Sequence, residues 1–190
     1  MADREIAASI LESCRHGDRD AFRALYEAYK DKVYSICLYF FHGDAAEAAD
    51  VTHEVFLKVF AGIAGFHGEA NFSTWLYRLT QNACLDGARR RAARARTVEA
   101  TERSLTTPLP NQLPTQYDDL TRAQEARTVQ QAVSSLPPKF RLPILLRYFQ
   151  DFSYEQMSAA LNCSMGTVAS RLNRGHKMLA KLLAAGGRDV

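Results

Sequence analysis

Apolar residues recur at three- to four-residue intervals along most of the chain, a spacing typical of amphipathic helices. Capping residues, glycines and prolines divide this pattern into separate segments. The pattern predicts helices over residues 4–14, 19–42, 44–60, 73–96, 120–136, 140–149, 153–161 and 164–183. No stretch of any length alternates with the two-residue period of a strand, so the expected fold class is all-α.

The last two of these helices have the pattern of a helix-turn-helix. Ser153 and Gln156 occupy the two positions of a capping box, and Ser164 begins the second, longer helix after a break at Asn162 and Cys163. An apolar stripe on the longer helix is expected to be buried, and it consists of Val168, Leu172, Gly175, Leu179 and Leu182. A turn between a short helix and a longer one suits a DNA-binding domain.

The other side of this longer helix is polar and cationic. Residues 156–188 include five Lys or Arg and no Asp or Glu. Cations neutralise phosphates, while Ser, Thr and Arg reach base edges in a major groove. The candidate DNA contacts are Ser164, Thr167, Ser170, Arg171, Arg174 and Lys177. A solvated basic surface helix is the alternative, but the coincidence of caps, turn and charge favours DNA binding.

The predicted helix over residues 44–60 has an acidic outer face. Val51 and Val55 mark its inward side, whereas Asp50 and Glu54 lie one turn apart on the outward side. Lys58, four residues beyond Glu54, can pair with one of these carboxylates. An exposed acidic pair is usually a matter of solubility, and the alternative is a docking face for a basic protein surface.

A glycine-rich loop with two aromatic residues precedes the next helix. Phe66 and Asn71 lie in this loop, and Trp75 lies in the first turn of the helix. The polar side of the helix carries Asn82, Asp86, Arg89 and Arg90 and ends in the run RRRAARAR. A solvated helix end is the simpler interpretation of that run. Beside an aromatic loop, the run favours a platform for single-stranded nucleic acid, where rings stack on bases and Arg follows phosphates.

Helical periodicity disappears between residues 97 and 119, a stretch with three prolines. We expect an extended linker there. The predicted organisation is therefore a front helical domain over residues 1–96, a flexible linker over 97–119 and a helix-turn-helix domain over 120–190. Pro143 is expected to kink or delay the helix over 140–149, because proline removes one backbone hydrogen bond.

Charge is unevenly distributed along the 190 residues. Residues 1–60 carry 7 Lys or Arg against 11 Asp or Glu, whereas residues 136–190 carry 8 against 3. An acidic front and a basic rear suggest one surface for a protein partner and others for nucleic acid. No segment approaches the about 20 apolar residues of a membrane span, and the charged first residues are unlike a signal peptide, so a cytoplasmic location is expected.

Cysteine and histidine suggest no strong metal site. Four cysteines are scattered without CxxC spacing. Cys14 with His16, or Cys37 with His42, could supply metal ligands, but isolated Cys at apolar helical positions is usually part of a core. No catalytic triad and no phosphate-binding glycine motif is evident, so we expect neither an enzyme nor a cofactor or small-molecule substrate.

Three segments together resemble the extracytoplasmic-function (ECF) type of bacterial RNA polymerase sigma factor. They are DVTHEVFLKVF (50–60), FSTWLYRLTQNACLDGARRR (72–91) and LPPKFRLPILLRYFQDFSYEQMSAALNCSMGTVASRLNRG (136–175). The segments occur in the order of the family and are separated by a linker of the expected character. The resemblance covers nearly the whole chain and is more specific than any one segment alone.

The resemblance implies binding to the β′ clamp of core RNA polymerase through Asp50, His53 and Glu54. It also implies capture of the melted −10 promoter element and recognition of the −35 element as duplex in the major groove. The implied −10 contacts are Phe66, Asn71, Trp75, Asn82, Asp86, Arg89 and Arg90, and the implied −35 contacts are the residues of the second helix named above. Such proteins often have an anti-sigma partner.

Three positions depart from the family pattern: His53 stands in place of a common Gln, Gly87 lies inside a helix, and His176 replaces a frequent Arg. Gly87 costs about 1 kcal/mol of helix propensity. The alternative function is a stand-alone helix-turn-helix regulator, which would bind duplex DNA without polymerase and usually as a dimer. The aromatic loop followed by the arginine run favours the sigma factor, because a duplex reader does not need stacking rings.

Overall fold

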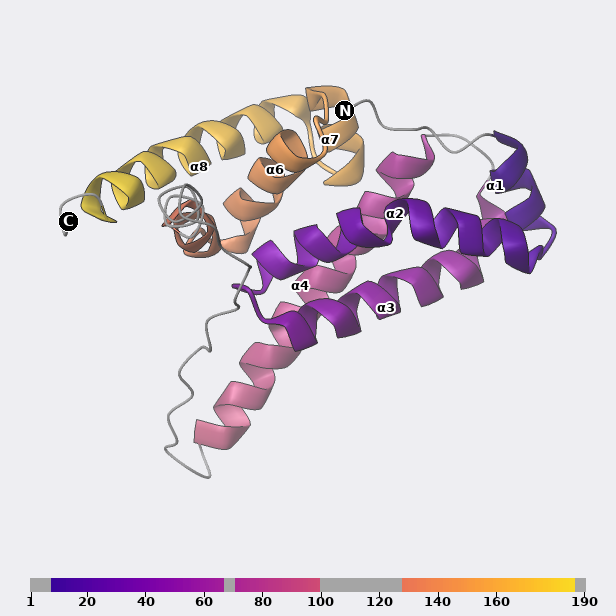
Figure 1. Cartoon of the computed structure of the whole chain (residues 1–190). Coiled ribbons are helices and arrows are strands. Elements are labelled where there is room, and N and C mark those ends of the chain that lie inside the picture. Colours follow the sequence, from indigo (N-terminus) through magenta and orange to yellow (C-terminus); the bar gives the residue numbers. More distant parts are fainter. Residues whose placement is uncertain (1–7, 67–70, 100–127, 187–190) are drawn as a thin grey trace, which may run out of the picture.

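Helices make up all the regular structure in the computed structural model, which describes residues 8–66, 71–99 and 128–186 (Figure 1). The predicted all-α class is confirmed. The elements are α1 (Ala8–Arg15), α2 (Arg19–Phe40), α3 (Ala45–Gly62), the 3₁₀ turn η1 (Ile63–Gly65), α4 (Phe72–Glu99), α6 (Pro138–Phe149), α7 (Tyr154–Ala160) and α8 (Met165–Gly186). Residues 128–134 are also helical.

Side-chain caps determine where the front helices begin. The Asp18 carboxylate accepts hydrogen bonds from the backbone N–H groups of Asp20 (2.8 Å) and Ala21 (3.1 Å), so α2 begins at Arg19. The Asp44 carboxylate accepts one from Glu47 N–H at 3.1 Å at the start of α3. Such an acceptor satisfies backbone N–H groups of the first turn that have no partner within the helix.

The front core lies between α2, α3 and α4. Val51, Val55 and Val59 on α3 are at most 1% exposed, as their spacing predicts. Gly87 explains how closely the helices approach, because an added Cβ would lie 2.9 Å from Phe41 Cζ and 3.3 Å from Val51 Cγ2. From the sequence alone, Gly87 was expected only to lower the stability of the helix. In the structure it makes room for the ring that packs beneath α4.

The helix-turn-helix forms at the predicted residues. Ser153 and Gln156 make both hydrogen bonds of the capping box, at 2.8 and 3.2 Å. Asn162 takes a positive φ of 48° in the turn, and the Ser164 hydroxyl accepts a hydrogen bond from Thr167 N–H at 3.2 Å. The turn therefore combines local caps with a backbone conformation that Asn tolerates better than most residues.

The buried stripe on α8 is shorter than predicted. Val168 and Leu172 are at most 2% exposed, and a Cβ on Gly175 would lie 3.3 Å from Ile144 of α6, whereas Leu182 is 37% exposed. The helix α6 has 12 residues against the 22 of α8, so the last turns of α8 extend beyond it. Expecting Leu182 in the stripe was therefore wrong.

Proline does not interrupt α6. The helix begins at Pro138, two residues earlier than predicted, and continues through Pro143 to Phe149. Pro138 occupies the first helical position, where its missing N–H and restricted φ favour the helix. Likewise, α4 continues to Glu99, three residues into the predicted linker. The remaining linker residues and the predicted helical residues 120–127 lie outside the described residues.

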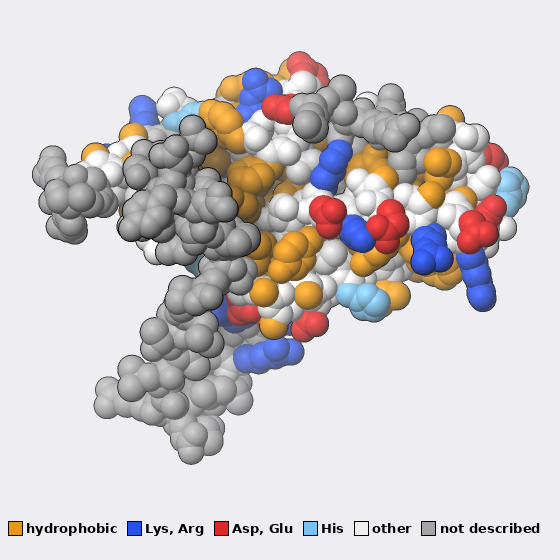
Figure 2. Space-filling model, in the orientation of Figure 1, with side chains coloured by type: hydrophobic (Ala, Val, Ile, Leu, Met, Phe, Trp, Pro, Cys, Tyr) orange, Lys and Arg blue, Asp and Glu red, His pale blue; other side chains and the backbone are white. Residues whose placement is uncertain are grey.

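The helix-turn-helix part packs directly on the front part. Among the described elements, α6 lies against α2, and α7 lies against α4 (Figure 1). The buried Arg141 guanidinium of α6 donates a hydrogen bond to the backbone carbonyl of Phe40 at the end of α2. Acidic and basic side chains are interspersed over α2 on the face of the molecule shown in Figure 2. The candidate binding residues therefore belong to two helical units that touch each other.

Candidate nucleic-acid interface

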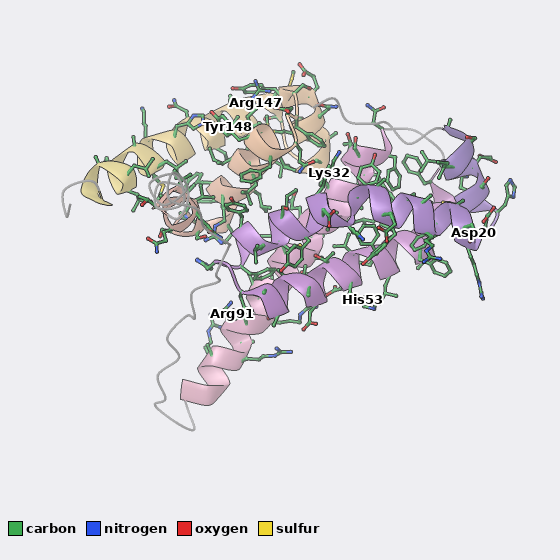
Figure 3. The ribbon with its side chains drawn as sticks, in the orientation of Figure 1. Asp20, Lys32, His53, Arg91, Arg147 and Tyr148 are labelled. Carbon is green, nitrogen blue, oxygen red and sulfur yellow. The ribbon has the colours of Figure 1, made fainter. Side chains whose placement is uncertain are left out.

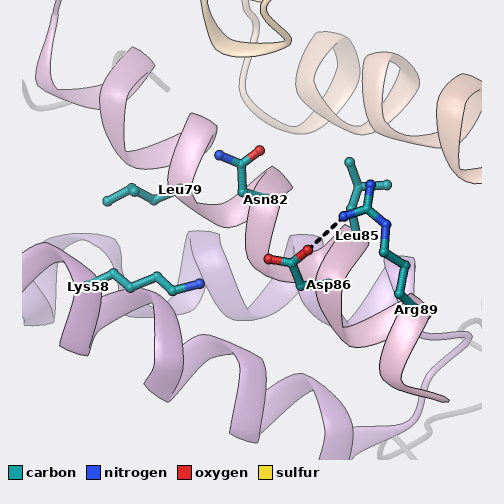
Figure 4. A pocket seen from close by; sticks show the side chains of 6 residues that line it. All are labelled: Lys58, Leu79, Asn82, Leu85, Asp86 and Arg89. Atoms are coloured by element: carbon teal, nitrogen blue, oxygen red, sulfur yellow. Dashed lines mark hydrogen bonds and ion pairs between the residues drawn. The ribbon is translucent and has the colours of Figure 1, made fainter. Parts of the chain in front are cut away.

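A pocket of about 480 Å³ lies between α3 and α4 (Figure 4). Its lining residues are Lys58, Leu79, Asn82, Leu85, Asp86 and Arg89. Asn82 is exposed, and Arg89 donates a hydrogen bond to the Asp86 carboxylate at 2.9 Å. Three residues that the sequence predicted for single-strand capture thus share one rim. The apolar side chains of Leu79 and Leu85 also line the pocket, so its surface is partly apolar and partly polar.

The aromatic residues near this helix are packed against each other. Phe66 and Trp75 rings lie 5.3 Å apart, and Phe72 lies 5.8 Å from Phe66 and 5.7 Å from Trp75. A Cβ on Gly62 would meet the Trp75 ring at 3.3 Å. Phe66 and Trp75 are half-buried, and Asn71 is exposed at the helix start. Trp75 therefore supports the start of α4, and residues 67–70 of the predicted loop lie outside the described residues.

The arginines near the end of α4 are ion-paired with acidic residues of the front domain. Arg90 Nη2 lies 2.7 Å from Glu54 Oε2, and Arg91 Nη1 lies 3.4 Å from Asp44 Oδ2. These pairs join α4 to α3 and to its N-terminal cap. The sequence did not indicate them, because the partners are 36 and 47 residues apart.

Glu54 pairs with Lys58, as its position on α3 allowed, and also with an arginine that the sequence did not indicate. Its side chain is 28% exposed and contacts both Lys58 Nζ and Arg90 Nη2 at 2.7 Å. The hydrogen bond from Arg90, followed by that from Lys58, lowers the pKa of the Glu54 carboxyl. Asp50, one turn earlier, is exposed, and no ion pair to it is found among the described residues. The two acidic residues therefore have different surroundings.

The outer face of α3 also carries apolar side chains. His53 is exposed on this face (Figure 3), and Leu57 and Phe60 further along the helix are 56% and 58% exposed. Leu57 and Phe60 were not among the contact residues predicted from the sequence. Their spacing from His53, four and seven residues, was the available signal, because such residues share a helix face. Exposed large apolar side chains with polar residues around them are typical of a protein interaction site.

The polar residues of α8, the candidate DNA-recognition helix, differ in how exposed they are to solvent. Ser164 and Ser170 are exposed, and their hydroxyls bond to Thr167 Oγ1 (2.9 Å) and to the Thr167 carbonyl (3.0 Å). Arg174 and Lys177 are exposed, whereas Arg171 is half-buried, with its guanidinium 3.7 Å from Cys163 Sγ. Arg171 thus folds back onto the turn, and Arg174 is the more accessible of the two arginines.

His176, one of the residues that depart from the family pattern, contacts α6. His176 Nε2 lies 3.0 Å from the Tyr148 hydroxyl, and the two rings pack edge to face. Figure 3 shows Tyr148 on the side of α6 that faces α8. His176 therefore helps to join α6 and α8.

The cysteines lie mainly in the interior. Cys37 and Cys84 are buried with their sulfur atoms 3.8 Å apart, and Cys14 is also buried. His16 pairs with Glu12 at 3.1 Å. In the part of the chain that the structure describes, no group of three or more His, Cys, Asp or Glu could hold a metal ion. Within the same residues, no helix has both the length and the apolar character needed to cross a bilayer.

Comparison with known proteins agrees with this geometry. The family models for Sigma-70 region 2 and Sigma-70 region 4 match residues 25–94 and 126–179. The first contains the α3–α4 pocket, and the second contains the helix-turn-helix.

Full-length relatives match along nearly the whole chain. The ECF RNA polymerase sigma factor SigW of Bacillus subtilis is 32% identical over 179 residues, 91% of this chain and 94% of SigW. The RNA polymerase sigma-H factor of Pseudomonas aeruginosa is 30% identical over 187 residues, 96% of each chain.

Two solved structures share the fold. The sigma factor RpoE of Bartonella quintana, solved with the anti-sigma factor NepR, superposes with a TM-score of 0.67 at 21% identity over 86% of this chain and 96% of RpoE. CnrH, solved with the cytosolic domain of CnrY, gives 0.66 at 18% identity over 93% and 96%. Both family models match in the expected order, and two sigma factors are at least 30% identical over more than 90% of this chain. This chain therefore belongs to the ECF-type sigma factors of bacterial RNA polymerase.

Proposed function

We propose that this sigma factor divides promoter recognition between the α3–α4 pocket and the polar face of α8. Recognition of the −10 element is assigned to the pocket, and the residues that line it are the main support for the proposal. Its rim offers the Asn82 amide, the Asp86 carboxylate and the Arg89 guanidinium, which together supply donors and acceptors for the edge of an unstacked base. Its volume lies within the range of small-ligand sites, about 300–1,000 Å³.

The single strand would follow the arginines from the pocket toward the end of α4. Arg89 and Arg90 are ion-paired in the free chain, so a phosphate would replace a carboxylate as the partner of each guanidinium. Asn71 is exposed at the start of α4 and could contact the strand at the opposite end of the helix. In this proposal Phe66 and Trp75 act mainly by supporting α4, because their rings pack on Phe72.

The duplex −35 element is assigned to α8. Ser164 and Thr167 lie at its N-terminal end, where backbone N–H groups favour phosphate, and Ser170 and Arg174 follow on the exposed face. Lys177 extends the cationic face for phosphate contacts. Arg171 would have to leave Cys163 before it could reach a base. The family assignment does not favour the stand-alone helix-turn-helix regulator.

Core polymerase is assigned to the outer face of α3. Asp50 and His53 would meet the basic surface of the β′ clamp, with Leu57 and Phe60 as apolar anchors beside them. Glu54 borders this face but is already engaged by Lys58 and Arg90. Its contribution to polymerase binding would therefore be smaller than that of Asp50.

The same proposal covers organisation and partners. The front domain would comprise residues 1–99, up to the end of α4, followed by a linker to residue 119 and the rear domain 120–190, working in the cytoplasm without catalytic activity or cofactor. Because RpoE of Bartonella quintana was solved with the anti-sigma factor NepR, and CnrH was solved with the cytosolic domain of CnrY, an anti-sigma partner is proposed for this chain as well.

Transcription from a random promoter library with bacterial core polymerase tests the division of labour. Asn82→Ala should relax sequence preference at the −10 element and leave the −35 preference unchanged, and Arg174→Ala should do the reverse. Each variant is thus the control for the other, and Arg23→Ala, an exposed change on α2 outside both proposed DNA sites, controls for loss of surface charge. Equal relaxation of both elements by either variant would contradict the assignment.

A further inference from the structure

Most polar side chains between residues 164 and 177 already have a partner within the chain. The hydroxyl groups bond to one another or to the backbone, and two longer side chains bond to Cys163 and Tyr148; the residues so engaged are Ser164, Thr167, Ser170, Arg171 and His176. Among the described residues, no hydrogen bond or ion pair is found for the side chains of Asn173, Arg174 and Lys177, and all three are exposed. These three side chains can therefore bind a ligand without first breaking an internal contact.

Asn173 lies on the side of α8 that faces away from the core. Val168 and Leu172 are at most 2% exposed and mark the buried side of the helix. At about 100° per residue, Asn173 is displaced by about 140° from Val168 and by about 100° from Leu172. Ser170, three residues earlier, and Lys177, four residues later, share the side of Asn173. Asn173 therefore lies within the exposed strip of α8.

The three free side chains differ in what they can recognise on duplex DNA. The Lys177 ammonium is a compact point charge and suits phosphate, whereas the Arg174 guanidinium can donate two hydrogen bonds to O6 and N7 of guanine. The Asn173 amide has both a donor NH₂ group and an acceptor oxygen. Adenine presents the matching pair in the major groove, because N7 accepts and the N6 amino group donates. Asn173 is thus chemically complementary to adenine.

Gly166, in the first turn of α8, lies on the same strip as Asn173. Among the described residues, the atom nearest to an added Cβ would be Ser164 Oγ at 4.0 Å, so internal packing does not require glycine there. Glycine also lowers helix stability relative to alanine. Its missing side chain instead leaves the first turn open to close approach by a ligand. This strip therefore suits insertion into a major groove, which is about 12 Å wide and admits a helix.

We propose that Asn173 is a specificity-determining residue for the −35 element and selects one adenine through hydrogen bonds to its N6 and N7 atoms. The inference rests on the proposed assignment of the −35 duplex to α8. Arg174 reads a different base, because consecutive side chains leave a helix about 100° apart. Asn173 was not among the DNA contacts predicted from the sequence, and its spacing from Ser170 and Lys177 was the available signal.

Transcription by the polymerase holoenzyme from promoters randomised only in the −35 element tests the proposal. The wild type should favour adenine at one position by about 5- to 150-fold, the discrimination expected of one bidentate contact. Asn173→Ala should lose the preference at that position alone. Asn173→Asp should favour cytosine there instead, because a carboxylate accepts from the cytosine N4 amino group but cannot donate to N7. Circular dichroism should show unchanged helical content, since both changes affect an exposed side chain without internal contacts.

Lys177→Ala is the matched control on the same strip. It should reduce initiation from all −35 sequences alike, because a phosphate contact carries no sequence information. The same uniform reduction in Asn173→Ala, or retention of every −35 preference, would overturn the proposal for Asn173. If neither Asn173→Ala nor Arg174→Ala changed any −35 preference, the assignment of the −35 duplex to α8 would fail as well.

Replacing the selected adenine by 7-deazaadenine tests the contact at a single atom. This analogue still pairs with thymine but lacks the N7 acceptor. Wild-type holoenzyme should initiate about 2- to 10-fold less from the substituted promoter, the range expected for one hydrogen bond. Asn173→Ala should initiate equally from both promoters. Equal initiation by the wild type would show that N7 is not contacted and would overturn the proposal.

Discussion

Replacing each α3 carboxylate separately tests the different surroundings of Asp50 and Glu54. Glu54→Gln removes the charge that holds Lys58 and Arg90, whereas Asp50→Asn removes an exposed charge with no ion pair among the described residues. From their outward positions on α3 alone, both residues would be expected to tolerate Lys without loss of stability. The structure revises that expectation, since a cation at position 54 would face two others.

The expected loss of stability follows from how exposed the ion-paired side chains are. The side chains of Glu54, Lys58 and Arg90 are 28%, 40% and 47% exposed, so both ion pairs are well screened by solvent. Exposed pairs contribute about 0–1 kcal/mol each, and the two together should stabilise the fold by about 0.5–1 kcal/mol. Glu54→Gln should therefore lower Tm by about 1–4 °C in a chain of this size. Asp50→Asn should change stability by less than about 0.5 kcal/mol.

Acid should abolish the difference between wild type and Glu54→Gln. The pKa of Glu54 is lowered in the folded chain, so its stabilisation is present above the ordinary value of 4.5 and is lost as pH falls through the lowered folded value. Thermal melts followed by circular dichroism at pH 7 and at about pH 3 measure this. A pH-independent difference, or equal effects of the two variants at pH 7, would refute the reasoning. In a pull-down with core polymerase, Asp50→Lys should lose binding while its Tm stays unchanged.

Three further changes test other parts of the structure. Gly87→Val should destabilise the front domain by about 2 kcal/mol in denaturant unfolding, because its side chain would collide with Phe41; a neutral result would show that α4 can move away. Ser153→Ala should cost about 1 kcal/mol by removing the α7 cap, and an unchanged unfolding midpoint would contradict this. Arg171→Ala and Arg174→Ala should each weaken −35 duplex binding by about 1–3 kcal/mol in fluorescence anisotropy without lowering Tm, and unchanged affinity in both would remove α8 as the reader.

Features determined by neighbouring residues were predictable from the sequence. The caps at Asp18, Asp44 and Ser153 act over two or three residues, so their pattern is visible in the chain itself. The inward valines of α3 and the turn before Ser164 follow from the same local rules. The helical class and the positions of most helices were therefore correct.

Features that depend on tertiary packing were not predictable in the same way. The second partner of Glu54 is Arg90, 36 residues away, and nothing in either segment identifies the other. Gly87 had no apparent reason until the Phe41 ring was found beneath it. Arg141 resembles any surface arginine of an amphipathic helix, and its burial depends on a second domain.

The contact of Arg141 with a backbone carbonyl of α2 has a genetic consequence. One domain contributes a side chain, and the other contributes a main-chain atom that every amino acid possesses. Loss of the arginine therefore has no simple compensating substitution at position 40, and suppressor mutations should arise elsewhere. Conversely, a rear domain transplanted onto another front domain should keep this hydrogen bond wherever the backbone of α2 ends in the same way.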